Sequence, residues 1–171
     1  MSIEEHIQAI LQLLDLDLKE TPQKVAQMLK RALVKPSYPR LSRLPAVHNQ
    51  QISLGPIRFM STCAHHLTPF FGTATISYMP NKWILGLGTI ARLVSYHAVG
   101  ATLQEKLTAE IARDFACILE VEDVEVALVA QHTCANDPYA TLKTTTSLGR
   151  FQKIYAMELS NHTPESQLLP A

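Results

Sequence analysis

The sequence has little of what marks a membrane-spanning, nucleic-acid-binding or secreted protein. Its longest strongly apolar run, residues 126–130, is far below the ~18 to 20 residues that cross a bilayer, so we expect no membrane insertion. Lysine plus arginine number 15, as do aspartate plus glutamate, so no overall field favours nucleic acid. Cysteines number only three, and residues 1–17 lack the lysines of a secretory signal. We therefore expect a cytoplasmic protein with reduced thiols, folded around one core.

Two of the three cysteines lie close to histidines. Residues 61–66 read STCAHH, which places Cys63 shortly before His66, and His132 comes shortly before Cys134. A lone Cys-x-x-His is often a buried core feature, but two elements that each hold both residue types favour a metal site. Zinc held by two thiolates and one imidazole keeps a fourth position for water, so the pattern indicates hydrolysis more than scaffolding. The other histidines show no comparable spacing: His6, His48, His97 and His162.

Residues 1–49 are predicted to form a helical arm with an exposed connector. Residues 3–14 place apolar side chains on one helical face, with Ser2 as the N-cap. A second helix is predicted to begin at Thr21, as its cap, with Pro22 in the first turn. Three prolines then predict an irregular connector over residues 35–49.

The remainder is predicted to form an α+β domain over residues 50–159, followed by a flexible tail over 160–171. Strands are expected at 51–60, 71–79, 124–132 and 144–151, and helices at 89–99 and 103–119. The order strand, strand, helix, helix, strand, strand predicts a mainly antiparallel sheet. We assign the third cysteine, Cys117, to the core, because we place it on the apolar stripe of its helix, near Phe115 and Ile118.

Several segments together resemble the type I GTP cyclohydrolases, zinc enzymes that open the purine of GTP to make dihydroneopterin triphosphate for pterins and folate. The matching segments, in the family's order, are residues 21–26 (TPQKVA), 61–72 (STCAHHLTPFFG), 103–108 (LQEKLT), 132–134 (HTC) and 144–149 (TTTSLG). The resemblance implies a ββααββ tunnelling-fold unit that assembles into an oligomeric barrel, as a homodecamer. It also implies zinc as the cofactor and a purine nucleotide as the substrate.

The resemblance implies a role for each matching site residue. Cys63, His66 and Cys134 would hold the zinc, whose water attacks C8 of the guanine ring. His65 and His132 would donate and accept protons around N7 and the opening ring, a task that suits imidazole because its pKa lies near neutrality.

The substrate-binding residues would be Gln104, Glu105 and Arg92. The Glu105 carboxylate would accept hydrogen bonds from guanine N1 and the exocyclic amine, and Gln104 would help to fix the ring. Taken without the family, an adjacent pair such as Gln104 and Glu105 is more typical of a solvated helix face. Arg92 matches the family's phosphate-binding arginine.

The departures from the family concentrate at the phosphates. Gly88 and Thr89 stand where members typically have serine and lysine, and Pro138 stands where an arginine is usual. Ala64 replaces a usual glutamate beside the zinc-binding cysteine. Because charge-assisted hydrogen bonds contribute roughly 1.5 to 3 kcal/mol each, two lost cations would weaken GTP binding unless Lys143 or another subunit compensates.

Three hypotheses about function follow. The first is a zinc-dependent cyclohydrolase acting on GTP, and the second is a paralog acting on a purine or pterin with fewer phosphates. The third is a zinc-stabilised module that binds a purine or pterin without turnover. Retention of the three metal ligands together with His65, His132 and Glu105 favours an enzyme.

Overall fold

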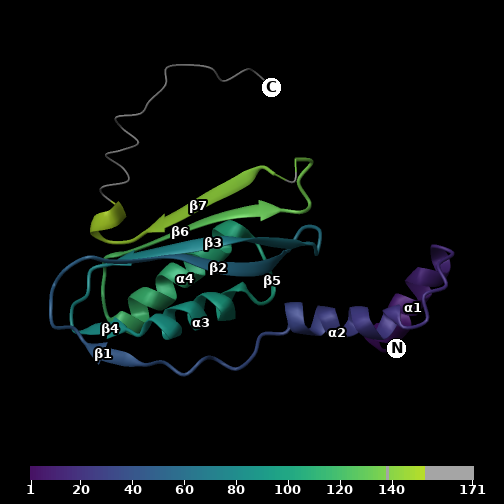
Figure 1. The fold of residues 1–171 in the computed structure, drawn as a ribbon, viewed down its shortest axis with the longest axis horizontal. Coiled ribbons are helices and arrows are strands. Elements are labelled where there is room, and N and C mark those ends of the chain that lie inside the picture. Colours follow the sequence, from purple (N-terminus) through teal and green to yellow (C-terminus); the bar gives the residue numbers. More distant parts are fainter. Residues whose placement is uncertain (138, 153–171) are drawn as a thin grey trace, which may run out of the picture.

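The computed structural model describes residues 1–137 and 139–152, which form a sheet with helices on one face and a helical arm that extends away from it (Figure 1). The prediction of a flexible tail over 160–171, like Pro138, falls outside the described residues. The helices are α1 (Ile3–Leu13), α2 (Thr21–Leu33), α3 (Leu87–Ala98) and α4 (Gln104–Leu119). The strands are β1 (Arg43–Pro45), β2 (Ile52–Cys63), β3 (Pro69–Tyr78), β4 (Trp83–Leu85), β5 (Ala101–Thr102), β6 (Val124–His132) and β7 (Thr141–Ser147).

The main sheet has the order β5-β2-β3-β6-β7, and all neighbours are antiparallel except the short β5, which runs parallel to β2. The predicted α+β class and mainly antiparallel sheet are therefore confirmed. Gly72, in the middle of β3, is required by the close approach of β6, because a Cβ there would overlap the Val129 carbonyl oxygen and Ala130. The β2–β3 and β3–β6 pairings bring the end of β2, the start of β3 and the end of β6 together.

Helix α4 packs its apolar face on β6 and β7, as its sequence pattern predicts. Leu107, Ile111 and Phe115 are fully buried and recur every four residues along one face. The assignment of Cys117 to the core is wrong, because its side chain is exposed. Residues i and i+2 of an α-helix are rotated by about 200° from each other around the helix axis. Cys117 therefore faces away from the side that buries Phe115.

The N-terminal arm consists of α1 and α2, which pack on each other. Ser2 is the N-cap of α1 as predicted, and it forms a reciprocal capping box with Glu5. In α2, Thr21 is the first helical residue rather than the cap, which is Glu20 and makes no side-chain capping bond. Many apolar side chains of the arm remain exposed in the single chain: Ile3, Ile10, Leu13, Leu14, Leu16, Leu18 and Met28.

The connector is less irregular than the prolines predict. Residues Arg43–Pro45 form β1, which pairs antiparallel with β4 in a separate two-stranded sheet. The connector is also fixed to the helices, because the Tyr38 hydroxyl donates to Asp114 Oδ2 at 2.7 Å and Arg43 lies 3.3 Å from Glu120. The prolines thus limit the length of β1 but do not prevent pairing.

The last predicted strand is displaced in the structure. β7 begins at Thr141 and ends at Ser147, whereas residues 144–151 were expected, and residues 150–152 are helical. Gly149 has a φ of 62°, a left-handed conformation that ends the extended chain. Its carbonyl accepts the Gln152 amide, and Asp123 binds Arg150, so the turn closes against the start of β6.

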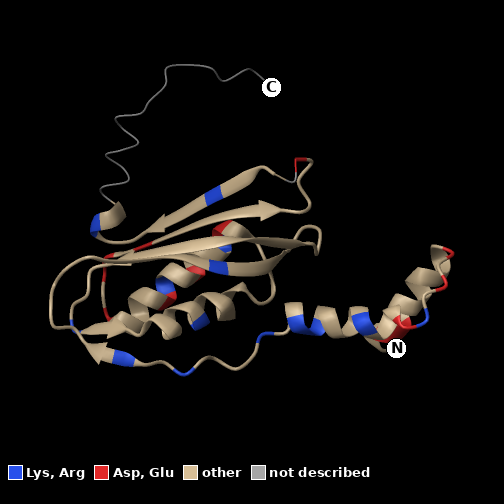
Figure 2. Ribbon diagram, in the orientation of Figure 1, with Lys and Arg blue, Asp and Glu red and all other residues tan. Residues whose placement is uncertain are grey.

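Charges of both signs are spread over the elements, with lysine and arginine most frequent along α2 and its exit (Figure 2). This distribution fits the zero formal net charge. Within the part of the chain that the structure describes, no helix combines the length and apolar character that a membrane span requires.

Candidate active site

The two Cys/His elements of the sequence meet at one end of the sheet. β2 ends at Cys63, a tight turn carries His66, and Cys134 follows the end of β6. The turn is closed by hydrogen bonds from the Leu67 amide to the Cys63 carbonyl and from the Cys63 amide to the Thr68 carbonyl, each 2.8 Å. The ligand atoms of Cys63, His66 and Cys134 all lie within 4.8 Å of one another. The chain therefore brings together the three residues that the family resemblance implies as metal ligands.

The geometry of these atoms fits a zinc ion. Zn–S bonds of about 2.3 Å in a tetrahedral site place the two sulfurs about 3.8 Å apart. The two sulfur atoms, of Cys63 and Cys134, are 3.9 Å apart. Cys63 is buried, Cys134 is half-buried and His66 is exposed, so the donor set is held on its protein side and open on the other. Three ligands with an open side are typical of catalytic rather than structural zinc sites.

His65 lies in the same turn but outside this donor set. Its ring is exposed and lies 6.1 Å from the His66 ring, at an angle of 78°. The two adjacent histidines therefore point in different directions, and only one of them faces the cysteines.

His132, the last residue of β6, is held on two sides. Its ring stacks on that of buried Phe70, with centroids 4.5 Å apart and planes 3° apart. Its Nε2 lies 2.9 Å from Gln104 Oε1. Burial lowers the pKa of His132, and the negative charge of Glu105 opposes that shift. This oriented imidazole lies two residues before Cys134 in the sequence.

Gln104 and Glu105 begin α4 and face different environments. The Gln104 side chain is 1% exposed and bonds to β6 and β7, whereas Glu105 is exposed. Glu105 follows Gln104, whose Oε1 lies 2.9 Å from His132 Nε2, so the start of α4 lies beside the site. One end of the sheet thus gathers a metal-ligand set, an oriented imidazole and a carboxylate, an arrangement suited to metal-assisted hydrolysis.

Comparison with known proteins agrees with this arrangement. A sequence model of the family described as GTP cyclohydrolase I matches residues 3–161. The chain belongs to the GTP cyclohydrolase I family. The GTP cyclohydrolase 1 of Shewanella amazonensis is 33% identical over 162 residues, which cover 86% of this chain and 75% of that protein. The Vibrio cholerae GTP cyclohydrolase 1 gives the same identity, length and coverage.

Among solved structures, the apo form of the archaeosine synthase QueF-Like matches 66% of this chain and 97% of that chain. The TM-score is 0.46 and the identity is 16%, a likeness too weak to carry an argument. Membership of the GTP cyclohydrolase I family, a family of hydrolases, classes this chain as an enzyme.

Arg92, the arginine matched to the family's phosphate site, lies on α3. Its Nη2 donates to Thr89 Oγ1 at 3.1 Å, and Thr89 is 2% exposed. Within the described residues, no hydrogen bond or ion pair links Arg92 or Lys143 to the Cys/His end of the sheet. Pro138 lies outside the described residues, so the position that replaces the family's arginine has no structural account.

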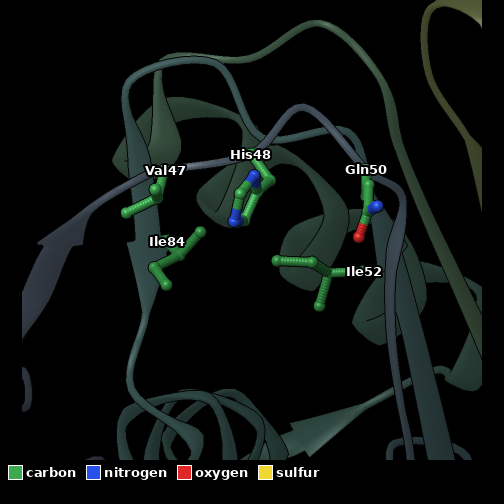
Figure 3. A pocket seen from close by; sticks show the side chains of 5 residues that line it. All are labelled: Val47, His48, Gln50, Ile52 and Ile84. Atoms are coloured by element: carbon green, nitrogen blue, oxygen red, sulfur yellow. The ribbon is translucent and has the colours of Figure 1, made fainter.

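Two of the surface hollows in the described part of the chain lie at opposite ends of β2. One, of about 410 Å³, is lined by Val47, His48, Gln50, Ile52 and Ile84 (Figure 3) and lies at the end of β2 remote from Cys63. A second, of about 280 Å³, lies between α2 and the Cys63 end of β2, and its lining includes Met28, Met60 and Leu67.

The sequence prediction missed Phe70, Thr108 and Thr144, which support the site residues. Phe70 supports the His132 ring, and the two threonines bond to each other and to Gln104. All three lie in segments that resemble the family, and this could have identified them. Each residue type is also common in a core or a strand, so the residues alone do not stand out.

Proposed function

We propose that this member of the GTP cyclohydrolase I family is a zinc-dependent enzyme that opens the guanine imidazole ring of GTP at C8. The products would be formate and 7,8-dihydroneopterin triphosphate, a precursor of pterins and folate. The observation that supports this most is the convergence of Cys63, His66 and Cys134 within 4.8 Å, beside His132. Measurement of formate release from GTP tests it.

In this proposal Cys63, His66 and Cys134 hold the zinc. Zn²⁺ supplies a Lewis acid, which can lower the pKa of a water molecule to about 7 and so provide hydroxide at neutral pH. The ligands have to be thiolates, so the cysteines must stay reduced, and we place the enzyme in the cytoplasm for this reason. The exposed side of His66 is the side from which a purine can approach.

The two other histidines would move protons. His132, neutral and fixed by Phe70 and Gln104, would exchange a proton with the opening ring, and His65 would serve N7 from the turn. Neither role requires an external redox cofactor. Glu105 would accept hydrogen bonds from N1 and the exocyclic amine of guanine, a pair of parallel donors that a carboxylate matches.

We expect Glu105→Ala to raise KM for GTP by about 10- to 100-fold with a smaller effect on kcat, because charge-assisted hydrogen bonds contribute roughly 1.5 to 3 kcal/mol each. Glu110→Ala is the matched control, since Glu110 lies on the same helix and pairs with Lys106 at 3.7 Å. Steady-state kinetics on both variants makes the comparison. An unchanged KM in Glu105→Ala would remove this residue from guanine recognition.

We further propose that the active enzyme is a homo-oligomer, a decamer built around a barrel. Strand β7 has one neighbour among the described strands and so presents a free edge, and barrel closure removes such edges. The exposed apolar side chains of the arm, such as Leu13 at 87% and Leu14 at 62%, also need a partner. Each site would then be completed by residues of a neighbouring copy.

Analytical ultracentrifugation is expected to show one oligomeric species of about ten chains. Leu13→Glu together with Leu14→Glu should shift it toward smaller species, because the two charges would have to be buried at the interface. Gln12→Glu, on the same helix, is the control for added charge alone. A monomer that retains full turnover would contradict both the assembly and the shared site.

A second candidate substrate is a guanine compound with fewer phosphates. The observation that favours it is the absence of a lysine at position 89, where buried Thr89 instead accepts a hydrogen bond from Arg92. The phosphate end would then discriminate weakly between GTP and guanosine, unless Lys143 or a neighbouring subunit supplies the missing charge.

We expect Thr89→Lys to tighten GTP by about 1 to 3 kcal/mol with little change for guanosine. Because Thr89 is buried, Gly88→Lys is a second variant, as a Cβ at this exposed position meets only Arg92 Nη1, at 3.4 Å. Binding constants for GTP and guanosine, with a melting curve for each variant, make the test. If wild type prefers GTP over guanosine by 10³ or more and both variants keep this preference, other residues bind the triphosphate.

A further inference from the structure

The Gln104 side chain uses both of its donor hydrogens inside the protein. Its Nε2 lies 2.9 Å from the Leu142 carbonyl oxygen, 3.1 Å from Thr144 Oγ1 and 3.3 Å from the Leu128 carbonyl oxygen. Its Oε1 lies 2.9 Å from His132 Nε2. The two amide hydrogens therefore already have acceptors on β6 and β7, and none is left to bind a purine.

These partners fix the orientation of the amide group. Carbonyl oxygens only accept hydrogen bonds, so the NH₂ group must face Leu128 and Leu142, and Oε1 must face His132. An amide oxygen also only accepts, so His132 Nε2 must be the donor. A neutral His132 is thereby held with its proton on Nε2, and Nδ1 is the ring nitrogen with a free lone pair.

Two threonines complete the network with the same directionality. Thr108 Oγ1 donates to the Gln104 backbone carbonyl at 2.7 Å, which uses its only hydrogen. The 2.6 Å bond between the threonine hydroxyls is then donated by Thr144, whose oxygen accepts from Gln104. Every donor in the network from His132 to Thr108 thus faces at least one acceptor, and reversing the amide would leave two carbonyl oxygens facing another oxygen.

We propose that Gln104 is a positioning residue rather than a substrate contact, and that it holds His132 in the Nε2-protonated tautomer so that Nδ1 exchanges the proton with the substrate. The inference rests on the proposed function for the role of His132. It replaces the expectation that Gln104 binds the guanine ring. Phe70 fixes the plane of the same ring, so the amide and the stacking contact together determine where Nδ1 points.

Steady-state kinetics with GTP separates the two roles of Gln104. Gln104→Met keeps the length of the side chain but loses the acceptor for His132, so we expect kcat to fall about 10- to 100-fold with KM within threefold and zinc content unchanged. In a His132→Ala background the same substitution should lower kcat no further, because its effect acts through the imidazole. A large rise in KM with unchanged kcat, or an additive loss in the double variant, would overturn the proposal.

Two further variants distinguish a specific effect on His132 from a general destabilisation of the fold. Thr144→Val removes one acceptor of the amide and should lower kcat in the same direction by a smaller factor. Ser147→Ala removes a 2.9 Å bond to Glu125 on the same strand pair, remote from His132, and should leave kcat unchanged. Equal losses in Thr144→Val and Ser147→Ala would identify a general structural effect and contradict the specific one.

The tautomer itself can be measured without turnover. In ¹⁵N-histidine-labelled wild-type oligomer, solid-state ¹⁵N NMR with the His132 signals assigned by their loss in His132→Ala should show a protonated Nε2 and an unprotonated Nδ1 in the neutral ring. An Nδ1-protonated ring would refute the positioning role. If wild type turns over no GTP but shows this tautomer, the proposed function fails while the inference about Gln104 as a positioning residue for His132 stands.

Discussion

Cys134→Ala is expected to reduce bound zinc from about one per chain to near zero and to lower GTP turnover by about 10³-fold or more. The substitution removes one of three protein ligands, and the Lewis acid that is lost with the metal contributes several kcal/mol to transition-state stabilisation. The Cys134 sulfur lies 3.9 Å from that of Cys63, and the remaining cysteine, Cys117, is exposed on α4 outside this cluster. Elemental analysis and steady-state kinetics on the purified protein measure both effects.

Cys117→Ala provides the matched control. Cys117 is the remaining cysteine and is exposed on α4, so its loss removes a thiol without touching the Cys/His cluster. We expect zinc content and turnover to stay at the wild-type level. If Cys134→Ala kept its zinc, or if Cys117→Ala lost it, the metal would be held by a different donor set.

His132→Ala is expected to lower kcat by about 10² to 10⁴, the range typical of a general acid-base group, with a much smaller change in KM. The imidazole contacts Gln104 and Phe70 but is not part of the donor set, so zinc content should be unchanged. His48→Ala serves as the control, because His48 lines the hollow at the opposite end of β2 (Figure 3) and should be silent. Near-wild-type turnover in His132→Ala would show that another group moves the proton.

Much of the fold could be predicted from the sequence, because the main elements carry strong periodic patterns. The apolar spacing from Leu107 to Phe115 predicted α4, and β6 occurs over the predicted residues 124–132. The predicted helix over 89–99 occurs as Leu87–Ala98, two residues earlier at its start. These elements are specified by side chains that alternate between core and solvent, which is a local signal.

The errors arose where local signals and tertiary contacts differ. Cys117 was placed in the core because it has apolar neighbours in sequence, although its angular position on α4 points it outward. β1 was missed because Pro45 is unfavourable in a strand. Proline lacks a backbone N–H, but an edge strand tolerates it where the pairing requires no donor at that position.

The candidate site also combines features that the sequence predicted with features that depend on tertiary contacts. Cys63, His66 and Cys134, the ligand set that the family resemblance implies, do meet in space. The residue types alone indicated a metal site but did not choose among His65, His66 and His132. The burial of Gln104 could not be foreseen, since its partners on β6 and β7 lie 24 to 40 residues away along the chain. A polar pair at the start of a helix is ordinarily solvated, and only the tertiary network reveals the difference.

Formate release from GTP by the purified protein, measured before and after zinc removal, tests the proposed reaction most directly. We predict one formate for each GTP consumed, with loss of the purine absorbance, no release after chelation of the metal, and recovery when zinc is restored. Binding of GTP by zinc-loaded oligomer without any formate release would contradict the proposal and leave a binding module, and formate release that survives complete removal of zinc would contradict the role assigned to Cys63, His66 and Cys134.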